Sequence, residues 1–121
     1  MSDLTVDTRD VEDVTVLYPR GFINAHTVRG FDSAIQKAVA RRRFRVIVNC
    51  EGLTYIASAG LGAMMGAIEE IRASGSDLRM ACLNETVHNI FEILGFNHLY
   101  KTFPSEAEAI ASFREGGQAA S

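Results

Sequence analysis

A nearly continuous apolar run, from Val46 to Cys50, constrains the fold of this chain more than any other feature. A run without regular polar alternation is typical of a central strand that helices cover on at least one face. Segments with helical periodicity stand before and after it, and strands that are joined through a helix run parallel. The run therefore predicts an α/β domain built on a mostly parallel sheet.

The segment before the central strand predicts a hairpin and a helix. Residues 11–22 alternate apolar and polar side chains, as a strand does, and residues 4–8 are expected to pair with them. Apolar residues then recur at helical spacing from about Thr27 to Arg42. Asn24 and Thr27 are both competent N-caps for this first helix.

Three further helices and two further strands are predicted after the central strand. A second helix follows Ser58, a third follows Asn84, and a last helix opens at Pro104. Residues 78–83 and 99–103 are the two strands.

Together these elements predict one domain over residues 1–115, with a flexible C-terminal tail at residues 116–121. The expected sheet is mixed and mostly parallel, with about four to five strands and about four helices, and it opens β-β before α and β alternate. The helices are expected mainly on one face of the sheet or at its flanks. The pattern leaves the strand order open.

Composition is that of an ordinary globular domain: 121 residues, of which 47% are hydrophobic and 22% are charged. Cys50 and Cys82 lie in apolar runs outside any CxxC pair, so both are expected to be small buried hydrophobes. No apolar run has the length of a signal peptide or a membrane span. A cytoplasmic location without membrane association is therefore expected.

The charge distribution argues against nucleic acid as a partner, because the formal net charge is −3. The one basic cluster, residues 41–45, falls at the predicted end of the first helix, where cations complement the helix dipole. A structural role is therefore favoured over a binding patch. The three histidines lack the spacing of zinc ligands, and no metal or cofactor is expected.

The segment with the most specific pattern runs from the central strand to the second helix. A short loop follows the strand, and the turn Ser58-Ala-Gly-Leu-Gly62 opens the helix. This arrangement resembles the STAS domain of anti-sigma factor antagonists, in which the turn typically reads Asp-Ser-Ser/Thr-Gly-Leu-Gly. Residues 21–27 are similar to the Gly-x-Leu-Asp-x-x-Thr segment of that family, and residues 94–96 match the end of its third helix. The resemblance covers nearly the whole chain.

The resemblance implies that this protein is an anti-sigma factor antagonist, a protein-binding switch and not an enzyme. Ser58 matches the serine that is phosphorylated by a partner, which is both anti-sigma factor and serine kinase, and a cognate phosphatase is expected to reverse the modification. Such a diffusible antagonist is expected to be a monomer. The residues expected to contact the partner are Asn24, His26, Thr27, Ala57, Ser58, Ala59, Gly60, Leu61, Gly62 and Met65.

Two departures from the family pattern favour a different role for the same fold. Ala57 and Asn24 stand where the family usually has aspartate, so two carboxylates near Ser58 are absent. A STAS domain that is not phosphorylated, acting as an interaction or scaffold subunit of a larger signalling or transport complex, is the alternative. A serine hydrolase is not expected, because Ile56 stands where the Gly-x-Ser-x-Gly elbow needs its first glycine.

Local alternatives also stand open at the turn. Ser58 could simply cap the second helix, and Gly60 and Gly62 could serve close packing or leave room for a nucleotide phosphate carried by the kinase. If Ser58 begins the helix, the free N–H groups of Gly60 and Leu61 are expected near its hydroxyl. Met64 and Met65 could both belong to an adaptable docking surface, but core filling is favoured for Met64, whose spacing lies on the apolar stripe of the helix.

Overall fold

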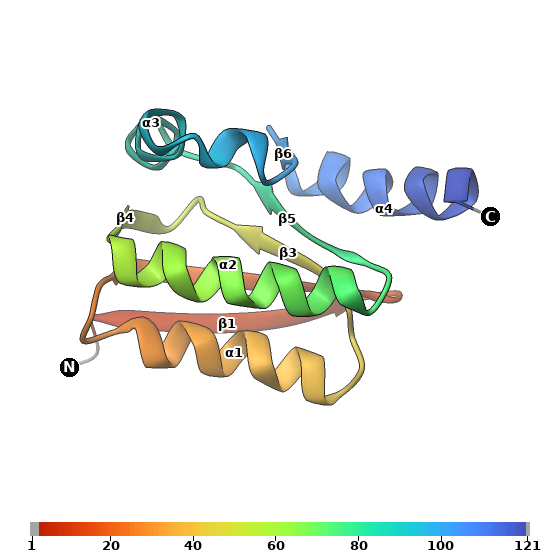
Figure 1. The fold of residues 1–121 in the computed structure, drawn as a ribbon, viewed down its shortest axis with the longest axis horizontal. Helices are drawn as coiled ribbons and strands as arrows, with labels where there is room; N and C mark the ends of the chain where they lie inside the picture. The colour runs from red at the N-terminus through yellow and green to blue at the C-terminus, as the bar shows by residue number, and fades with distance from the viewer. Residues whose placement is uncertain (1–2, 121) are drawn as a thin grey trace.

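The computed structural model describes residues 3–120, apart from the side chains of Asn97 and residues 115–120. Within these residues the chain forms one mixed sheet and four α-helices (Figure 1). The strands are β1 (Leu4–Val11), β2 (Val14–Ile23), β3 (Arg45–Asn49), β4 (Leu53–Ile56), β5 (Asp77–Ala81) and β6 (Thr102–Phe103). The helices are α1 (Val28–Ala40), α2 (Ser58–Ala73), α3 (Glu85–Leu94) and α4 (Glu106–Ala120), with a short 3-10 turn, η1 (Phe96–His98).

The sheet has the order β1-β2-β3-β5-β6, and β4 extends the line of β3 by pairing with the far end of β2. Only the β1–β2 pair is antiparallel, and every other pair is parallel. The predicted mixed, mostly parallel sheet that opens β-β is therefore confirmed. Strand β4 was not predicted because it has only four residues. Only the first and last of them are buried, so its side chains do not alternate between buried and exposed.

Helices cover both faces of the sheet. Alternate residues of β3 divide between two cores: Val46 and Val48 face α1, α2 and α3, whereas Ile47 faces α4. Figure 1 shows α1 and α2 side by side, running in the same direction, and α4 apart from them. The expectation that the helices gather on one face holds for three of them, and α4 is the exception.

The basic cluster at the end of α1 is tied to the β1–β2 hairpin. Arg41 forms an ion pair with Asp10, and Nη1 of Arg45 lies 2.9 Å from Oδ2 of Asp13. The guanidinium of Arg43 donates to the carbonyl oxygen of Val14 at 3.0 Å. These contacts support the structural interpretation of the cluster, because its cations neutralise an acidic turn of the same chain.

The two cysteines differ from each other. Cys50 is fully buried, and burial raises the pKa of its thiol to about 12. Cys82 is half-buried, which corrects the expectation that both are buried. The reason is local: Cys82 follows the end of β5 with φ +59°, and this left-handed backbone turns its side chain toward the α4 side of the sheet.

Helix α4 continues to Ala120, through residues where the sequence predicted a flexible tail. Ser121 lies outside the described residues, and the mobility of residues 116–121 stays a prediction. No helix in residues 3–120 has both the length and the apolar character that a membrane crossing requires.

Candidate functional site

The carboxyl ends of β2 and β4 meet at one edge of the sheet. Ile23 and Ile56, the last residues of these parallel strands, are register partners, and the N–H of Ala57 donates to the carbonyl oxygen of Ile23 at 2.8 Å. Residues 24–27 and 57–62 therefore leave the sheet side by side, and each leads into a helix. Figure 1 shows α1 and α2 beginning at the same end of the molecule. We call these two segments, together with Met65, the junction site.

Ser58 is the first residue of α2, and its side chain is exposed. Ala57, not Ser58, is the N-cap residue, with φ −89° and ψ 172°, and no side chain caps the helix. The hydroxyl of Ser58 has no hydrogen-bond partner among the described residues. The interpretation of Ser58 as a simple helix cap is therefore wrong, and its hydroxyl is available to other molecules.

The free backbone donors at this helix end are not those the sequence predicted. The N–H groups of Gly60 and Leu61 both donate to the carbonyl oxygen of Ala57, at 2.9 and 3.2 Å. Within the part of the chain that the structure describes, the N–H groups of Ser58 and Ala59 have no acceptor. The free donors therefore belong to the first two helical residues, beside the serine hydroxyl, as in an ordinary helix start.

The two glycines of the turn have different roles. A Cβ atom on Gly60 would lie 2.5 Å from Cγ2 of Ile23 and 2.8 Å from Cγ1 of Ile56, so only glycine lets α2 approach the strands this closely. A Cβ atom on Gly62 would meet nothing within 4 Å. Close packing thus explains Gly60, while Gly62 leaves a bare, exposed stretch of helix surface.

The remaining α2 positions of the predicted site divide between core and surface. Leu61 is 3% exposed and belongs to the main core, as does Met64. Met64 is 1% exposed, in agreement with the core role favoured for it, whereas Met65 is 40% exposed. Four residues of this segment are exposed or half-buried and could contact a partner together with Ser58: Ala57, Ala59, Gly62 and Met65.

The loop from β2 to α1 forms a tight turn around Asn24. The side-chain oxygen of Asn24 accepts hydrogen bonds from the N–H of His26 at 2.8 Å and the N–H of Thr27 at 3.1 Å. The hydroxyl of Thr27 donates to the carbonyl oxygen of Phe22 at 2.9 Å. An aspartate would offer the same acceptor, so asparagine keeps the loop geometry and removes only the charge. His26 is exposed at the tip of this loop.

The junction site carries no formal charge. None of residues 24–27 and 57–62 is Asp, Glu, Lys or Arg. Beside it lies Tyr55 of β4, which is 50% exposed and pairs in register with Phe22. Sequence reasoning missed Tyr55 along with its strand, although the strand-forming pair Thr54-Tyr55 was a usable signal.

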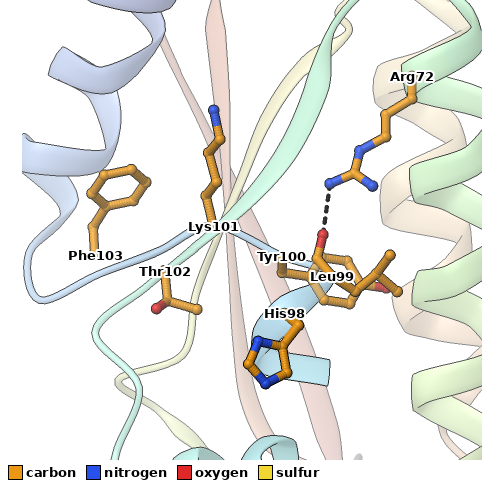
Figure 2. Close-up of a pocket in the computed structure, with 7 residues that line it drawn as sticks. All are labelled: Arg72, His98, Leu99, Tyr100, Lys101, Thr102 and Phe103. Carbon is orange, nitrogen blue, oxygen red and sulfur yellow. Dashed lines mark hydrogen bonds between the residues drawn. The ribbon is translucent and has the colours of Figure 1, made fainter. Parts of the chain in front are cut away.

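A separate hollow lies at the opposite end of α2 (Figure 2). It is a shallow groove of about 670 Å³, where Arg72 donates to the carbonyl oxygen of Leu99 at 2.7 Å. Arg72 stands 14 positions after Ser58, which is about 21 Å along a helix. The groove therefore belongs to another part of the molecule. Among the described residues no group of three or more His, Cys, Asp or Glu side chains could hold a metal ion.

Comparison with known proteins gives a consistent result. A family model described as the STAS domain matches residues 5–109. BtrV of Bordetella bronchiseptica, whose name proposes an anti-sigma factor antagonist, is 25% identical over 92% of this chain and 94% of its own. The unphosphorylated anti-sigma factor antagonist SpoIIAA has a TM-score of 0.79 and 23% identity, over 92% of this chain and 97% of SpoIIAA.

The phosphorylated form of SpoIIAA, described as a Bacillus cell fate determinant, has the same fold as this chain. Its TM-score is 0.66 at 20% identity, over 90% of this chain and 97% of that one. At identities of 23% and 20%, the likeness to the two SpoIIAA forms shows a shared fold and nothing finer.

Proposed function

Because the chain belongs to the STAS domain family, we propose that it is an anti-sigma factor antagonist whose partner binding is switched by phosphorylation of Ser58. Its partner is an anti-sigma factor with serine kinase activity, and a phosphatase restores the unmodified form. The protein acts by binding and not as an enzyme. The observation that carries this proposal is the exposed, unpartnered hydroxyl of Ser58 at the start of α2.

The helix start can accept a phosphoryl group without unfolding. The free N–H groups of Ser58 and Ala59 and the positive end of the helix dipole both favour negative charge there. The dipole contributes about 0.3 to 1 kcal/mol at an exposed site. Modification is therefore expected to change the surface of the domain and leave its fold intact.

The negative charge added by phosphorylation accounts for the change in partner affinity. The unmodified junction site is uncharged and can be covered by a partner at little electrostatic cost. A phosphoryl group adds about −1.5 to −2 charges at neutral pH. Burying a charge without a counter-ion costs on the order of 2 to 5 kcal/mol, or roughly 30-fold to several thousand-fold in affinity. The phosphorylated protein is therefore released.

The proposed partner surface is narrower than the sequence suggested. Gly60 and Leu61 are left out because both are buried. The exposed or half-buried residues that stay in it are Asn24, His26, Thr27, Ala57, Ser58, Ala59, Gly62 and Met65.

The experiment uses the purified chain, ATP, magnesium and a kinase-type anti-sigma factor from the same organism. Intact mass follows the addition of one phosphate, and calorimetry measures the affinity of each form for the anti-sigma factor. We expect one phosphate on the native chain, none on Ser58→Ala, and at least a 30-fold loss of affinity on phosphorylation, as follows from about 2 kcal/mol.

The matched control is Ser74→Ala, since Ser74 is an exposed serine at the other end of the same helix. It should be phosphorylated and should bind as the native chain does. A phosphate that persists in Ser58→Ala, or a phosphorylated chain that binds with undiminished affinity, would contradict the proposal.

One observation favours the alternative of a scaffold module that is not phosphorylated. Ala57 and Asn24 leave the surroundings of Ser58 without a carboxylate. In that case the chain binds its partner through the junction site but receives no phosphate in the same assay. Ser58→Asp would still weaken binding, because the uncharged surface would still be covered.

A further inference from the structure

Strand β1 is the outer strand of the sheet, and no described strand lies beyond it. It pairs with β2 through a hairpin of two turn residues, in which Val11 is the partner of Val14. The residues that flank a two-residue turn exchange both backbone hydrogen bonds, so the odd-numbered residues of β1 point their N–H and C=O groups at β2. The carbonyl oxygen of Asp3 follows this rule, since it accepts from the N–H of Phe22 at 3.3 Å.

The even-numbered residues Val6, Thr8 and Asp10 therefore direct their backbone N–H and C=O groups away from the sheet. Such a row of groups is a template for another strand, and natural proteins usually blunt it with charge, proline or a bulge. Within its described length β1 has no proline, and it pairs with β2 without a break in register. Its charged residues decide which strand it can accept.

Those charges are self-complementary. Consider two copies of β1 paired antiparallel about a two-fold axis that passes beside Thr8. The outward N–H and C=O groups of Thr8 then bond to those of Thr8 in the second copy, and Val6 stands opposite Asp10 of that copy. The same register sets Asp7 directly opposite Arg9, twice, on one face of the joined sheet. Opposite charges at directly facing positions stabilise a strand pair, whereas like charges destabilise it. A register centred on Asp7 would instead set Asp7 against itself.

Asp7 and Arg9 are accessible for this contact. Their side chains are 62% and 59% exposed, although each has an ion-pair partner in its own chain, Arg20 for Asp7 and Glu106 for Arg9. The Asp7–Arg20 pair is exposed on both sides and contributes little, whereas in the other pair Arg9 reaches from the surface to a Glu106 side chain that is 19% exposed. A second copy would extend each pair into a row of alternating charges.

Helix α1 also fits the two-fold pair. It packs on both β1 and β2, so its axis lies above the space between these strands. In the two-fold pair, the axes of the two α1 helices would therefore be about two strand spacings, or about 9.6 Å, apart. Packed helices have axes about 8 to 10 Å apart. The flank of α1 on the β1 side includes Gly30, whose added Cβ would lie 3.9 Å from Leu4, and Ala34 one turn later. Small side chains there let the two helices approach.

From this edge we propose that the protein forms a two-fold dimer by antiparallel pairing of β1 with β1 of a second copy, in the register that sets Asp7 opposite Arg9. The contact uses the outer edge of the sheet and the β1 flank of α1. It does not use residues 57–65, so each copy keeps Ser58 exposed. This proposal departs from the monomer that the sequence predicts, but it does not require phosphorylation of Ser58.

The first test is the molar mass in solution, by sedimentation equilibrium over a concentration series that reaches the millimolar range. The native chain is expected to move from 13.2 kDa to twice that mass. Thr8→Pro removes an N–H that points away from β2, so the hairpin should survive while the dimer is lost. Thr8→Ala keeps the N–H and should still dimerise, and circular dichroism checks that both variants fold.

Charge reversal tests the register. Arg9→Asp places like charges opposite each other and should weaken the dimer, whereas the double variant Asp7→Arg with Arg9→Asp restores opposite pairs and should recover it. A single-chain effect on folding would not show this recovery. If the double variant dimerises no better than Arg9→Asp, the register is wrong.

Cross-linking gives an independent readout. Residues opposite each other in a hydrogen-bonded antiparallel pair have Cα atoms about 5.5 Å apart, within the range of a disulfide. Thr8→Cys should therefore form a covalent dimer on mild oxidation with copper phenanthroline. Thr5→Cys should not, because the two thiols would be six positions out of register, or about 20 Å apart. A native chain that stays at 13.2 kDa throughout, or a dimer that Thr8→Pro leaves unchanged, overturns the proposal.

Discussion

The N–H of Ala57 donates to the carbonyl oxygen of Ile23 at 2.8 Å, which joins the start of α2 to the end of β2. Through this bond, two loops that lie at least thirty positions apart in the sequence form one surface. Ala57 also accepts from the N–H groups of Gly60 and Leu61. The backbone of one alanine thereby fixes the helix start and leaves the hydroxyl of Ser58 without a structural role.

Ser58→Ala should leave stability almost unchanged. Because Ser58 is exposed and does not cap α2, the free energy of unfolding should change by less than about 0.5 kcal/mol, whereas loss of a true N-cap costs about 1 kcal/mol. Ser58→Asp should stabilise the helix start by about 0.3 to 1 kcal/mol at low salt. Urea unfolding measures both values, and a cost above 1 kcal/mol for Ser58→Ala would show a structural role.

Gly60→Ala should destabilise the domain by about 1 to 3 kcal/mol, because the added methyl group would overlap Ile23 and Ile56. Gly62→Ala is the matched control two positions along the same helix, where the methyl group meets nothing within 4 Å. It should stabilise the helix by about 0.5 to 1 kcal/mol. Urea unfolding of the two variants should therefore give shifts of opposite sign, and equal shifts would contradict the packing assigned to Gly60.

Asn24→Ala should cost about 0.5 to 2 kcal/mol, because the N–H groups of His26 and Thr27 lose their side-chain acceptor. Asn24→Asp keeps an acceptor oxygen at the same place and should stay within about 0.5 kcal/mol of the native chain. Thermal unfolding of the pair checks this difference. Should Asn24→Asp prove as unstable as Asn24→Ala, the turn would depend on the amide nitrogen instead.

The carboxyl group of Glu106 should make the free energy of unfolding decrease at acidic pH. Burial raises the pKa of its carboxyl group, but hydrogen bonds from Tyr18, Asn49 and Arg9 outweigh that effect and hold the pKa below 4.5. Because the pKa of Glu106 is lower in the folded protein, the ionised carboxylate stabilises the fold above about pH 4.5. This stabilisation is lost as the pH falls through the pKa of the folded state. This stabilisation is expected to be about 1 kcal/mol or less, since the Arg9 side chain of the ion pair is 59% exposed and solvent screens its charge.

Urea unfolding at neutral and acidic pH tests this expectation. Glu106→Gln should lower stability at neutral pH and flatten its decline in acid relative to the native chain. Glu69→Gln removes an exposed carboxylate from α2 and serves as the control for the loss of one charge. If Glu106→Gln shows the same acid dependence as the native chain, the three hydrogen bonds do not stabilise the ionised form.

Sequence alone located the elements whose signals are local. Asn84 was predicted to cap α3 and Gly95 to end it, and the side chain of Asn84 accepts from the N–H of Val87 at 2.9 Å while Gly95 has φ +76°. Gly75 likewise follows the end of α2 with φ +86°. Caps and periodicity depend on residues within one or two turns, so they can be read directly from the order of side chains.

The turn at Ser58 was identified by sequence, but its local geometry was not. The pattern placed the serine at a strand-to-helix junction, yet it assigned the free donors to Gly60 and Leu61. The choice between these donors depends on where the helix begins, and a shift of one residue changes which N–H groups are left free. Only the observed hydrogen bonds of the Ala57 carbonyl decided it.

Local patterns of side chains specified the alternating order of strands and helices, the apolar face of each, and the serine at the start of α2. The tertiary structure decided that β4 pairs with β2, that α4 covers the opposite face of the sheet, and that Asn24 lies beside Ala57. These relations join residues far apart in the chain, and their free energy depends on strand order and mutual burial. No local pattern of side chains carries that information.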